Sequence, residues 1–210
     1  VPANATAVTG NLTVTDQTLG WAVFLGPDPS PSPSTSTVNF TAGEVRANGV
    51  TVALSSSGSL SATYLSTAGQ TTNLVFDVTG YFTPDDSGAK FVPVSPARIL
   101  DTRVGNGLNG PFVAGKPRTF NVTGAGGVPT SAIGVTGNLT VTDQTQAWAV
   151  FLGPNPTSSP TTSTVNFSAG KVIANGVTVA LGSGGTLSAT YLSTTGQTTS
   201  LVFDVTGYFA

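Results

Sequence analysis

The sequence predicts an all-β protein made of two tandem, jelly-roll-like β-sandwich domains that derive from an internal duplication. Three observations support this prediction. Short runs of Val, Leu, Phe and Tyr alternate with Thr, Ser and Asn, as in strands with one buried face. Gly and Pro interrupt the chain about every 8–12 residues, which is the turn spacing of sandwiches and barrels. A long segment of the chain also occurs twice.

The duplication covers residues 1–82 and 128–209, which align without a gap at an offset of 127 positions. Only 18 of the 82 aligned positions differ, and the differences concentrate where loops are expected, as in the Pro/Ser/Thr-rich passage at 27–36. We therefore predict a first repeat core at 1–82, a polar linker at 83–90 and a second repeat at 91–209.

The second repeat begins with an unrepeated segment, residues 91–127, which contains the string RILDTR at Arg98–Arg103. We name residues 91–127 the LDTR segment. The 210 residues thus contain two repeat cores and one LDTR segment. If each core needs such a segment to cover an edge, one core is left incomplete. The alternative is that this chain is an excerpt of a longer protein.

The alternating runs of the first core predict its strands in chain order. Residues 49–66, GVTVAL-SSSG-SLSATYLS, are predicted to form a hairpin because two alternating runs flank a Ser/Gly turn. The Pro/Ser/Thr passages at 27–37 and 154–164 are predicted to be surface loops, since proline cannot donate a ladder hydrogen bond. The other strands of the first core are predicted at residues 7–15, 21–25, 37–41 and 74–82.

The amino-acid composition excludes several classes of function. The chain has no His and no Cys, which excludes a Ser-His-Asp triad, a cysteine nucleophile and an ordinary zinc site. Charged residues make up 8% of the chain and the net charge is −2, so a nucleic-acid partner is not expected. No apolar run reaches the roughly 18 residues of a membrane span. We expect no cofactor, no metal and no enzyme activity, although a carboxylate-only enzyme is not excluded by composition.

Three motifs carry a family resemblance: FVPVSPARILDTRVGNG at 91–107, NLTVT at 11–15 and 138–142, and FDVTGYF at 76–82 and 203–209. In these motifs the chain resembles β-repeats of secreted actinobacterial and chloroflexal surface proteins. The resemblance implies β-rich extracellular modules, appended to secreted hydrolases or arrayed in large surface proteins. It therefore implies an extracellular or cell-surface location.

The charged residues of the LDTR segment are conspicuous in so uncharged a chain. We expect Asp101, between Arg98 and Arg103, to pair with one or both arginines as a structural clasp. The alternative is a site for a sugar or an anion. Asp204 and its equivalent Asp77 lie in apolar strands, where an unpaired buried charge is costly. We expect both to be structural, with the arginines paired to Asp204, rather than acids of a glycosidase.

Two further groups of residues are candidates for contact with sugar. We expect Trp21 and Trp148 to pack in the cores, together with the four tyrosines; the alternative is a platform on which sugar rings stack. The loop hydroxyls of the first core are equally interpretable as O-glycosylation sites or as solvated turn residues. They are Ser30, Ser32, Ser34 and Thr35.

The leading functional hypothesis is an extracellular structural protein, a self-assembling subunit of a surface filament or sheath built from tandem β repeats. Its partners would be copies of itself, joined head-to-tail by strand addition at an open edge. The alternative hypothesis is a carbohydrate- or cell-wall-binding accessory module of a secreted protein.

Overall fold

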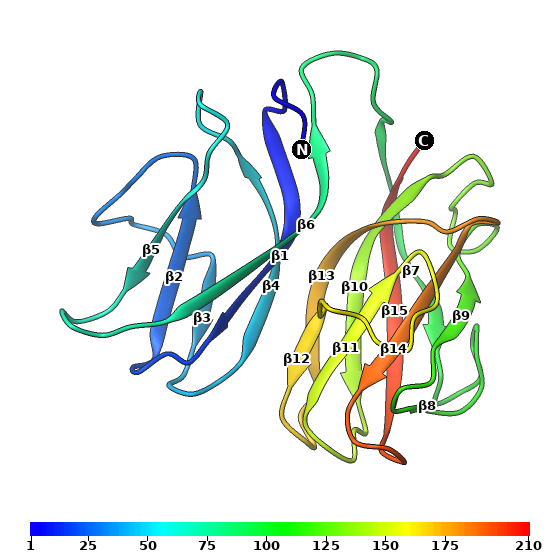
Figure 1. The fold of residues 1–210 in the computed structure, drawn as a ribbon. Helices are drawn as coiled ribbons and strands as arrows, with labels where there is room; N and C mark the ends of the chain where they lie inside the picture. The colour runs from blue at the N-terminus through cyan, green and yellow to red at the C-terminus, as the bar shows by residue number, and fades with distance from the viewer. The chain divides into compact units, whose positions relative to one another are not determined.

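The computed structural model describes all 210 residues and consists of strands and irregular segments without any helix. The all-β prediction is confirmed. The chain divides into two compact units, Val1–Gly88 (unit 1) and Ala89–Ala210 (unit 2), and their boundary falls within the stretch predicted as a linker. In Figure 1 strands β1 to β6, coloured from blue to teal-green, belong to unit 1, and strands β7 to β15 belong to unit 2. The structure has no helix suited to crossing a membrane.

Unit 1 consists of two antiparallel sheets of three strands each. In one sheet the strand order is β4-β1-β6, and in the other it is β3-β2-β5. Strands β5 and β6 are therefore both edge strands. The bounds are β1 (Ala7–Thr15), β2 (Trp21–Gly26), β3 (Val38–Phe40), β4 (Arg46–Ala53), β5 (Ser61–Leu65) and β6 (Asn73–Phe82).

Unit 2 has the same two orders, β13-β10-β15 and β12-β11-β14, and extends each of them with strands of the LDTR segment. Strands β7 (Phe91–Asp101) and β8 (Phe112–Val113) pair with β15, and β9 (Arg118–Asn121) pairs with β14. The other bounds are β10 (Gly134–Thr142), β11 (Trp148–Gly153), β12 (Val165–Phe167), β13 (Ile173–Ala180), β14 (Thr186–Leu192) and β15 (Thr198–Phe209).

The two units share their strand registers residue for residue at the offset of 127. Asn11 lies opposite Asp77 on β6, and Asn138 lies opposite Asp204 on β15. Both pairings shift by one residue at the same place, before Gly10 and before Gly137. A Cβ at Gly10 would lie 2.5 Å from the carbonyl oxygen of Asp77, so only glycine allows this close strand approach.

The hairpin predicted for residues 49–66 is wrong. Strand β4 pairs with β1 in one sheet, whereas β5 pairs with β2 in the other, so the Ser/Gly turn carries the chain across the core between the sheets. Alternation and turn residues indicate two strands and a reversal, but they do not say whether the second strand pairs with the first. Here each strand contributes to the core from its own sheet, because Val50 of β4 and Tyr64 of β5 both pack against the buried cluster of unit 1.

The cores of the two units differ in size. In unit 1 the buried cluster is small and is formed by Leu12, Val14, Val23, Val38 and Phe40. The core of unit 2 is larger because the LDTR segment adds its own side chains to it, among them Leu100, Phe112, Phe120 and Val122. The ring of Phe120 packs edge-on against Phe203 of β15, with 6.2 Å between centroids. The LDTR segment therefore closes unit 2 as part of its core.

Candidate functional site: the clasp of unit 2 and the open edge of unit 1

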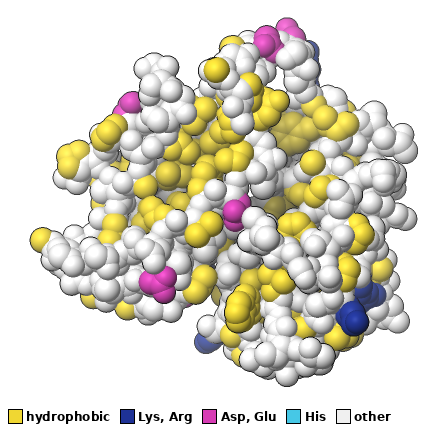
Figure 2. Space-filling view, in the orientation of Figure 1, with side chains coloured by type: hydrophobic (Ala, Val, Ile, Leu, Met, Phe, Trp, Pro, Cys, Tyr) yellow, Lys and Arg dark blue, Asp and Glu magenta, His cyan; other side chains and the backbone are white.

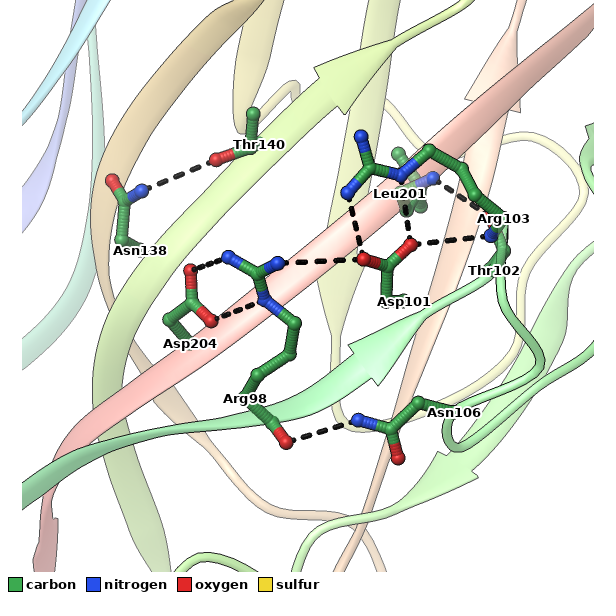
Figure 3. A network of polar contacts seen from close by, with 9 residues as sticks. All are labelled: Arg98, Asp101, Thr102, Arg103, Asn106, Asn138, Thr140, Leu201 and Asp204. Carbon is green, nitrogen blue, oxygen red and sulfur yellow. Dashed lines mark hydrogen bonds and ion pairs between the residues drawn. The ribbon is translucent and has the colours of Figure 1, made fainter.

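The charged residues of the LDTR segment form a clasp between β7 and β15 (Figure 3). Arg98 holds Asp204 in a bidentate pair, with 2.8 Å from Nε to Oδ1 and 3.2 Å from Nη2 to Oδ2. Its third nitrogen, Nη1, lies 3.4 Å from Oδ2 of Asp101. We name the group Arg98, Asp101, Arg103 and Asp204 the clasp. Asp77, the equivalent of Asp204, lies in unit 1 and is not part of the clasp.

Asp101 is the buried centre of the clasp. Arg103 donates to both of its oxygens, with 2.8 Å from Nε to Oδ1 and 2.7 Å from Nη2 to Oδ2. These hydrogen bonds lower the pKa of Asp101 to about 2, against the opposing effect of burial. At neutral pH the carboxylate is therefore ionised, and both of its oxygens accept hydrogen bonds from Arg103. This arrangement suits a structural role and not that of a proton donor.

The clasp is extended by backbone contacts that fix its geometry. Thr102 exchanges two hydrogen bonds with Leu201: its N–H donates to the Leu201 carbonyl, and its hydroxyl accepts from the Leu201 N–H, both at 3.1 Å. The side-chain amide of Asn106 donates to the carbonyl of Arg98 at 3.0 Å. The Thr102 contacts tie the turn after β7 to β15, and the Asn106 contact holds that turn against β7. The sequence identified the charges of this motif, but Thr102 and Asn106 within it were missed, because one hydroxyl and one amide do not stand out in a chain rich in such side chains.

Unit 1 presents an open edge where unit 2 is closed by the LDTR segment. We name open edge the outer sides of β5 and β6, with the core-facing side chains between them. Leu74 of β6 is 38% exposed, whereas its equivalent Leu201 is fully buried at 0%. Val78 is 47% exposed and its equivalent Val205 is 0% exposed. On β5, Tyr64 is half-buried while the equivalent Tyr191 is buried.

Figure 2 shows hydrophobic side chains gathered on unit 1 in the part of the view where β5 and β6 border it. On β6, Leu74, Val78 and Tyr81 are exposed, although their equivalents in unit 2 belong to the core cluster or pack against it. A row of exposed core-type side chains beside unpaired backbone groups is the surface that invites strand addition. The open edge is therefore a candidate polypeptide-binding site.

Asp77 lies on the open edge at the position that Asp204 occupies in the clasp. It is partly buried, and no hydrogen bond or ion pair holds its carboxylate. Burial alone raises its pKa, because the charged form loses hydration without gaining a partner. At this equivalent position, the negative charge of Asp204 is paired with a guanidinium in unit 2, whereas the charge of Asp77 has no such partner in unit 1.

The expectation that both tryptophans pack in the cores is wrong. Trp21 is 67% exposed and Trp148 is 68% exposed, each at the first position of its strand. The aromatic positions of the core are filled by Phe40 beside Tyr64 in unit 1, and by Phe167 stacked on Tyr191 in unit 2. The tyrosine hydroxyls donate to backbone carbonyls, which uses their polar ends within the fold. The tryptophans are exposed because they lie at the ends of their strands. The alternation of apolar and polar residues does not reveal where a strand ends, so the sequence did not predict this exposure.

The Pro/Ser/Thr passages lie outside the strands in both units, since β3 begins at Val38 and β12 at Val165. Among the candidate glycosylation residues, Ser32, Ser34 and Thr35 are exposed. Ser30 is half-buried, and its carbonyl accepts a 2.7 Å hydrogen bond from the hydroxyl of Thr63 on β5. The exposed three present hydroxyls to solvent, while Ser30 anchors the loop. No group of three or more acidic side chains converges to hold a metal ion.

Comparison with known proteins adds no relative: no family model, no curated protein and no solved structure matches this chain. The resemblance of residues 91–107 to secreted β-repeats therefore stays an expectation. What the molecule does is inferred from its own two units, which differ chiefly in whether an LDTR segment covers their edge.

Proposed function

We propose that this chain is an extracellular structural protein whose two β-sandwich units, copies of one duplicated jelly-roll-like module, join polypeptides into a surface filament or sheath. One observation carries this proposal. The open edge of unit 1 exposes side chains that the LDTR segment buries at the equivalent positions of unit 2. A second polypeptide that adds strands at this edge would gain both apolar burial and ladder hydrogen bonds.

The number of LDTR segments relative to the number of edges that they can cover determines the concentration at which copies of this chain associate. These 210 residues contain two cores and one LDTR segment, and that segment lies on its own β15 and β14. A copy that lends its segment to a neighbour's unit 1 opens its own unit 2, so one edge opens for each edge closed. The intramolecular segment competes at an effective concentration of roughly millimolar. Exchange between copies therefore becomes favourable only near that concentration.

Light scattering across concentration tests the proposal. We expect the purified chain to be monomeric at micromolar concentration and to form head-to-tail oligomers as the concentration approaches roughly a millimolar. Val78→Lys on the open edge should suppress this growth, because a cation among apolar groups prevents strand addition. Val45→Lys is the matched control at an exposed loop position of the same unit and should leave the growth unchanged. A monomer at every concentration would contradict self-assembly.

A second candidate function, carbohydrate binding, is favoured by the exposure of both tryptophans. An indole that stands free of the core at the same position of each unit offers a flat apolar face to a sugar ring. Titration with soluble cell-wall polysaccharides should then shift the tryptophan fluorescence, and Trp21→Ala with Trp148→Ala should abolish binding. Binding that survives both substitutions would remove the tryptophans from this role.

A further inference from the structure

We propose that the open edge of unit 1 binds a polypeptide segment with the sequence pattern of the LDTR segment, in the register that β7 and β9 take in unit 2. The inference rests on the proposed function and deepens it, because it names the partner. The occupant is a second segment of this pattern, since residues 91–127 of the same copy lie on unit 2.

The first argument is that the edge strands of the two units have the same sequence. Residues 74–82 of β6 repeat residues 201–209 of β15 without a change. Residues 60–66, which include β5, likewise repeat residues 187–193 without a change. Both edges therefore offer the same side chains, and β6 keeps the same pairing and bulge with its inner neighbour. A segment that fits one edge meets the same groups at the other.

The second argument is the register, which transfers directly between units. In unit 2, Phe203 lies opposite Leu100, Asp204 opposite Arg98 and Tyr208 opposite Val92. At the offset of 127, Phe76 would face the leucine of an added segment, Asp77 its arginine, and Tyr81 its valine. A one-residue slip would turn the apolar side chains of the segment away from the core, so this register is strongly specified.

The third argument is the space between the two sheets. In unit 2 that space is filled by Phe112 and Phe120 of the LDTR segment, both buried, and Phe120 lies opposite Leu187 on β14. The equivalent of Leu187 in unit 1 is Leu60, which is only partly buried. The two phenylalanines of an added segment would cover Leu60 and Phe76, so binding would engage both sheets at once.

The fourth argument is charge. Arg98 makes a bidentate pair with Asp204, which fixes the orientation of β7 against β15. Asp77 stands at the equivalent place, partly buried and without a guanidinium. An arginine arriving opposite Asp77 would satisfy a carboxylate that is already partly desolvated, so little further hydration is lost. In a chain with 8% charged residues this pair distinguishes the LDTR pattern from other apolar strands.

The experiment uses the full 210-residue chain and a synthetic peptide of residues 91–127. The peptide is added at micromolar concentration to ¹⁵N-labelled chain, and amide shifts are followed by NMR. The chain's own segment occupies unit 2 at an effective concentration of roughly millimolar, so the added peptide is directed to unit 1. We expect one peptide to bind per chain, with shifts concentrated in β5 and β6. A peptide of the same composition in scrambled order should not bind.

A charge exchange identifies the register. Asp77→Arg should weaken peptide binding about 10-fold or more, because it removes a charged hydrogen-bond pair and sets two cations together. A peptide carrying Arg98→Asp should recover part of the loss with the Asp77→Arg chain and should bind the unchanged chain poorly. Asp28→Asn, in an exposed loop of the same unit, is the matched control and should leave the affinity unchanged.

The outcomes separate this inference from the proposed function. Peptide binding at β5 and β6 with rescue by charge exchange supports the inference. Equal binding of the scrambled peptide, shifts confined to unit 2, or no binding at all would overturn it. Self-association that persists when unit 1 is saturated with peptide would mean that copies join through another surface. Assembly would then stand as the function but would not use the open edge, whereas the peptide binding at the open edge would stand by itself.

Discussion

Truncating one leucine at equivalent positions of the two units measures how much the LDTR segment contributes to stability. Leu201 of β15 is 0% exposed and Leu74 of β6 is 38% exposed, although their strands are identical in sequence from this leucine onward. Leu→Ala removes about 2.4 kcal/mol of transfer free energy at a fully buried site, at ~0.8 kcal/mol per carbon. An enclosed cavity adds to that loss.

The two variants should therefore differ by about a factor of two. Leu201→Ala leaves a cavity closed on all sides and should lower the unfolding free energy of unit 2 by about 3 kcal/mol. Because Leu74 is only partly buried, its truncation removes about three fifths of the transfer free energy of a fully buried leucine, and it leaves no closed cavity. Leu74→Ala should therefore lower the unfolding free energy of unit 1 by about 1.5 kcal/mol.

Fluorine NMR with 5-fluorotryptophan suits this comparison because each unit contains one tryptophan. The folded resonance of Trp21 follows unit 1 through a urea titration and that of Trp148 follows unit 2, and Trp21→Phe assigns them. Equal losses at the two positions would refute the reasoning, because they would mean that Leu74 is as enclosed as Leu201 and that the edge is not open.

Three further predictions use the same resolved unfolding measurement. Phe120→Ala should lower the stability of unit 2 by about 3–5 kcal/mol and leave unit 1 unchanged; an equal loss in unit 1 would show that the segment does not belong to unit 2 alone. The folded pKa of Asp101, about 2, lies below its ordinary 3.8, so unit 2 should be fully stabilised above about pH 4 and lose that contribution as pH falls towards 2. Asp101→Asn should remove this pH dependence, and its persistence in the variant would mean that other carboxylates cause it. Asp204→Asn should destabilise unit 2 by breaking the clasp, whereas Asp77→Asn should leave unit 1 as stable or more stable at pH 7, because the raised pKa of Asp77 means that ionisation there opposes folding. A marked loss of unit 1 stability in Asp77→Asn would reveal a partner for that carboxylate.

The positions of the strands follow closely from local pattern. The predicted run 7–15 coincides with β1, and the predicted run 74–82 differs from β6 by one residue. Alternation with period two is a local property of any strand that buries one face, and Gly and Pro mark where it stops. The same locality explains the failure at residues 49–66, because a turn looks alike whether it joins paired strands or crosses between sheets.

For the candidate site, too, the sequence identified the residues, whereas their geometry depends on the tertiary structure. RILDTR and the acids at positions 77 and 204 are visible as isolated charges in an uncharged chain, so the sequence identifies which residues matter. A pairing of the arginines with Asp204 was expected, but its geometry is not visible in the sequence, because Arg98 and Asp204 are 106 residues apart and meet only through the register of β7 on β15. Even the bulge after Phe203 in that register is needed to bring them opposite each other.

The sequence by itself determined that the chain is all-β, that its two cores are nearly the same, and that only one LDTR segment serves them within these 210 residues. Composition and period suffice for this, since they reflect which side chains each strand buries. Only the tertiary structure decided how the segment pairs with the second core and what its absence leaves exposed on the first. Residues 74–82 and 201–209 are identical, yet one set is largely buried and the other largely exposed, because burial depends on the neighbouring strand and not on the strand itself.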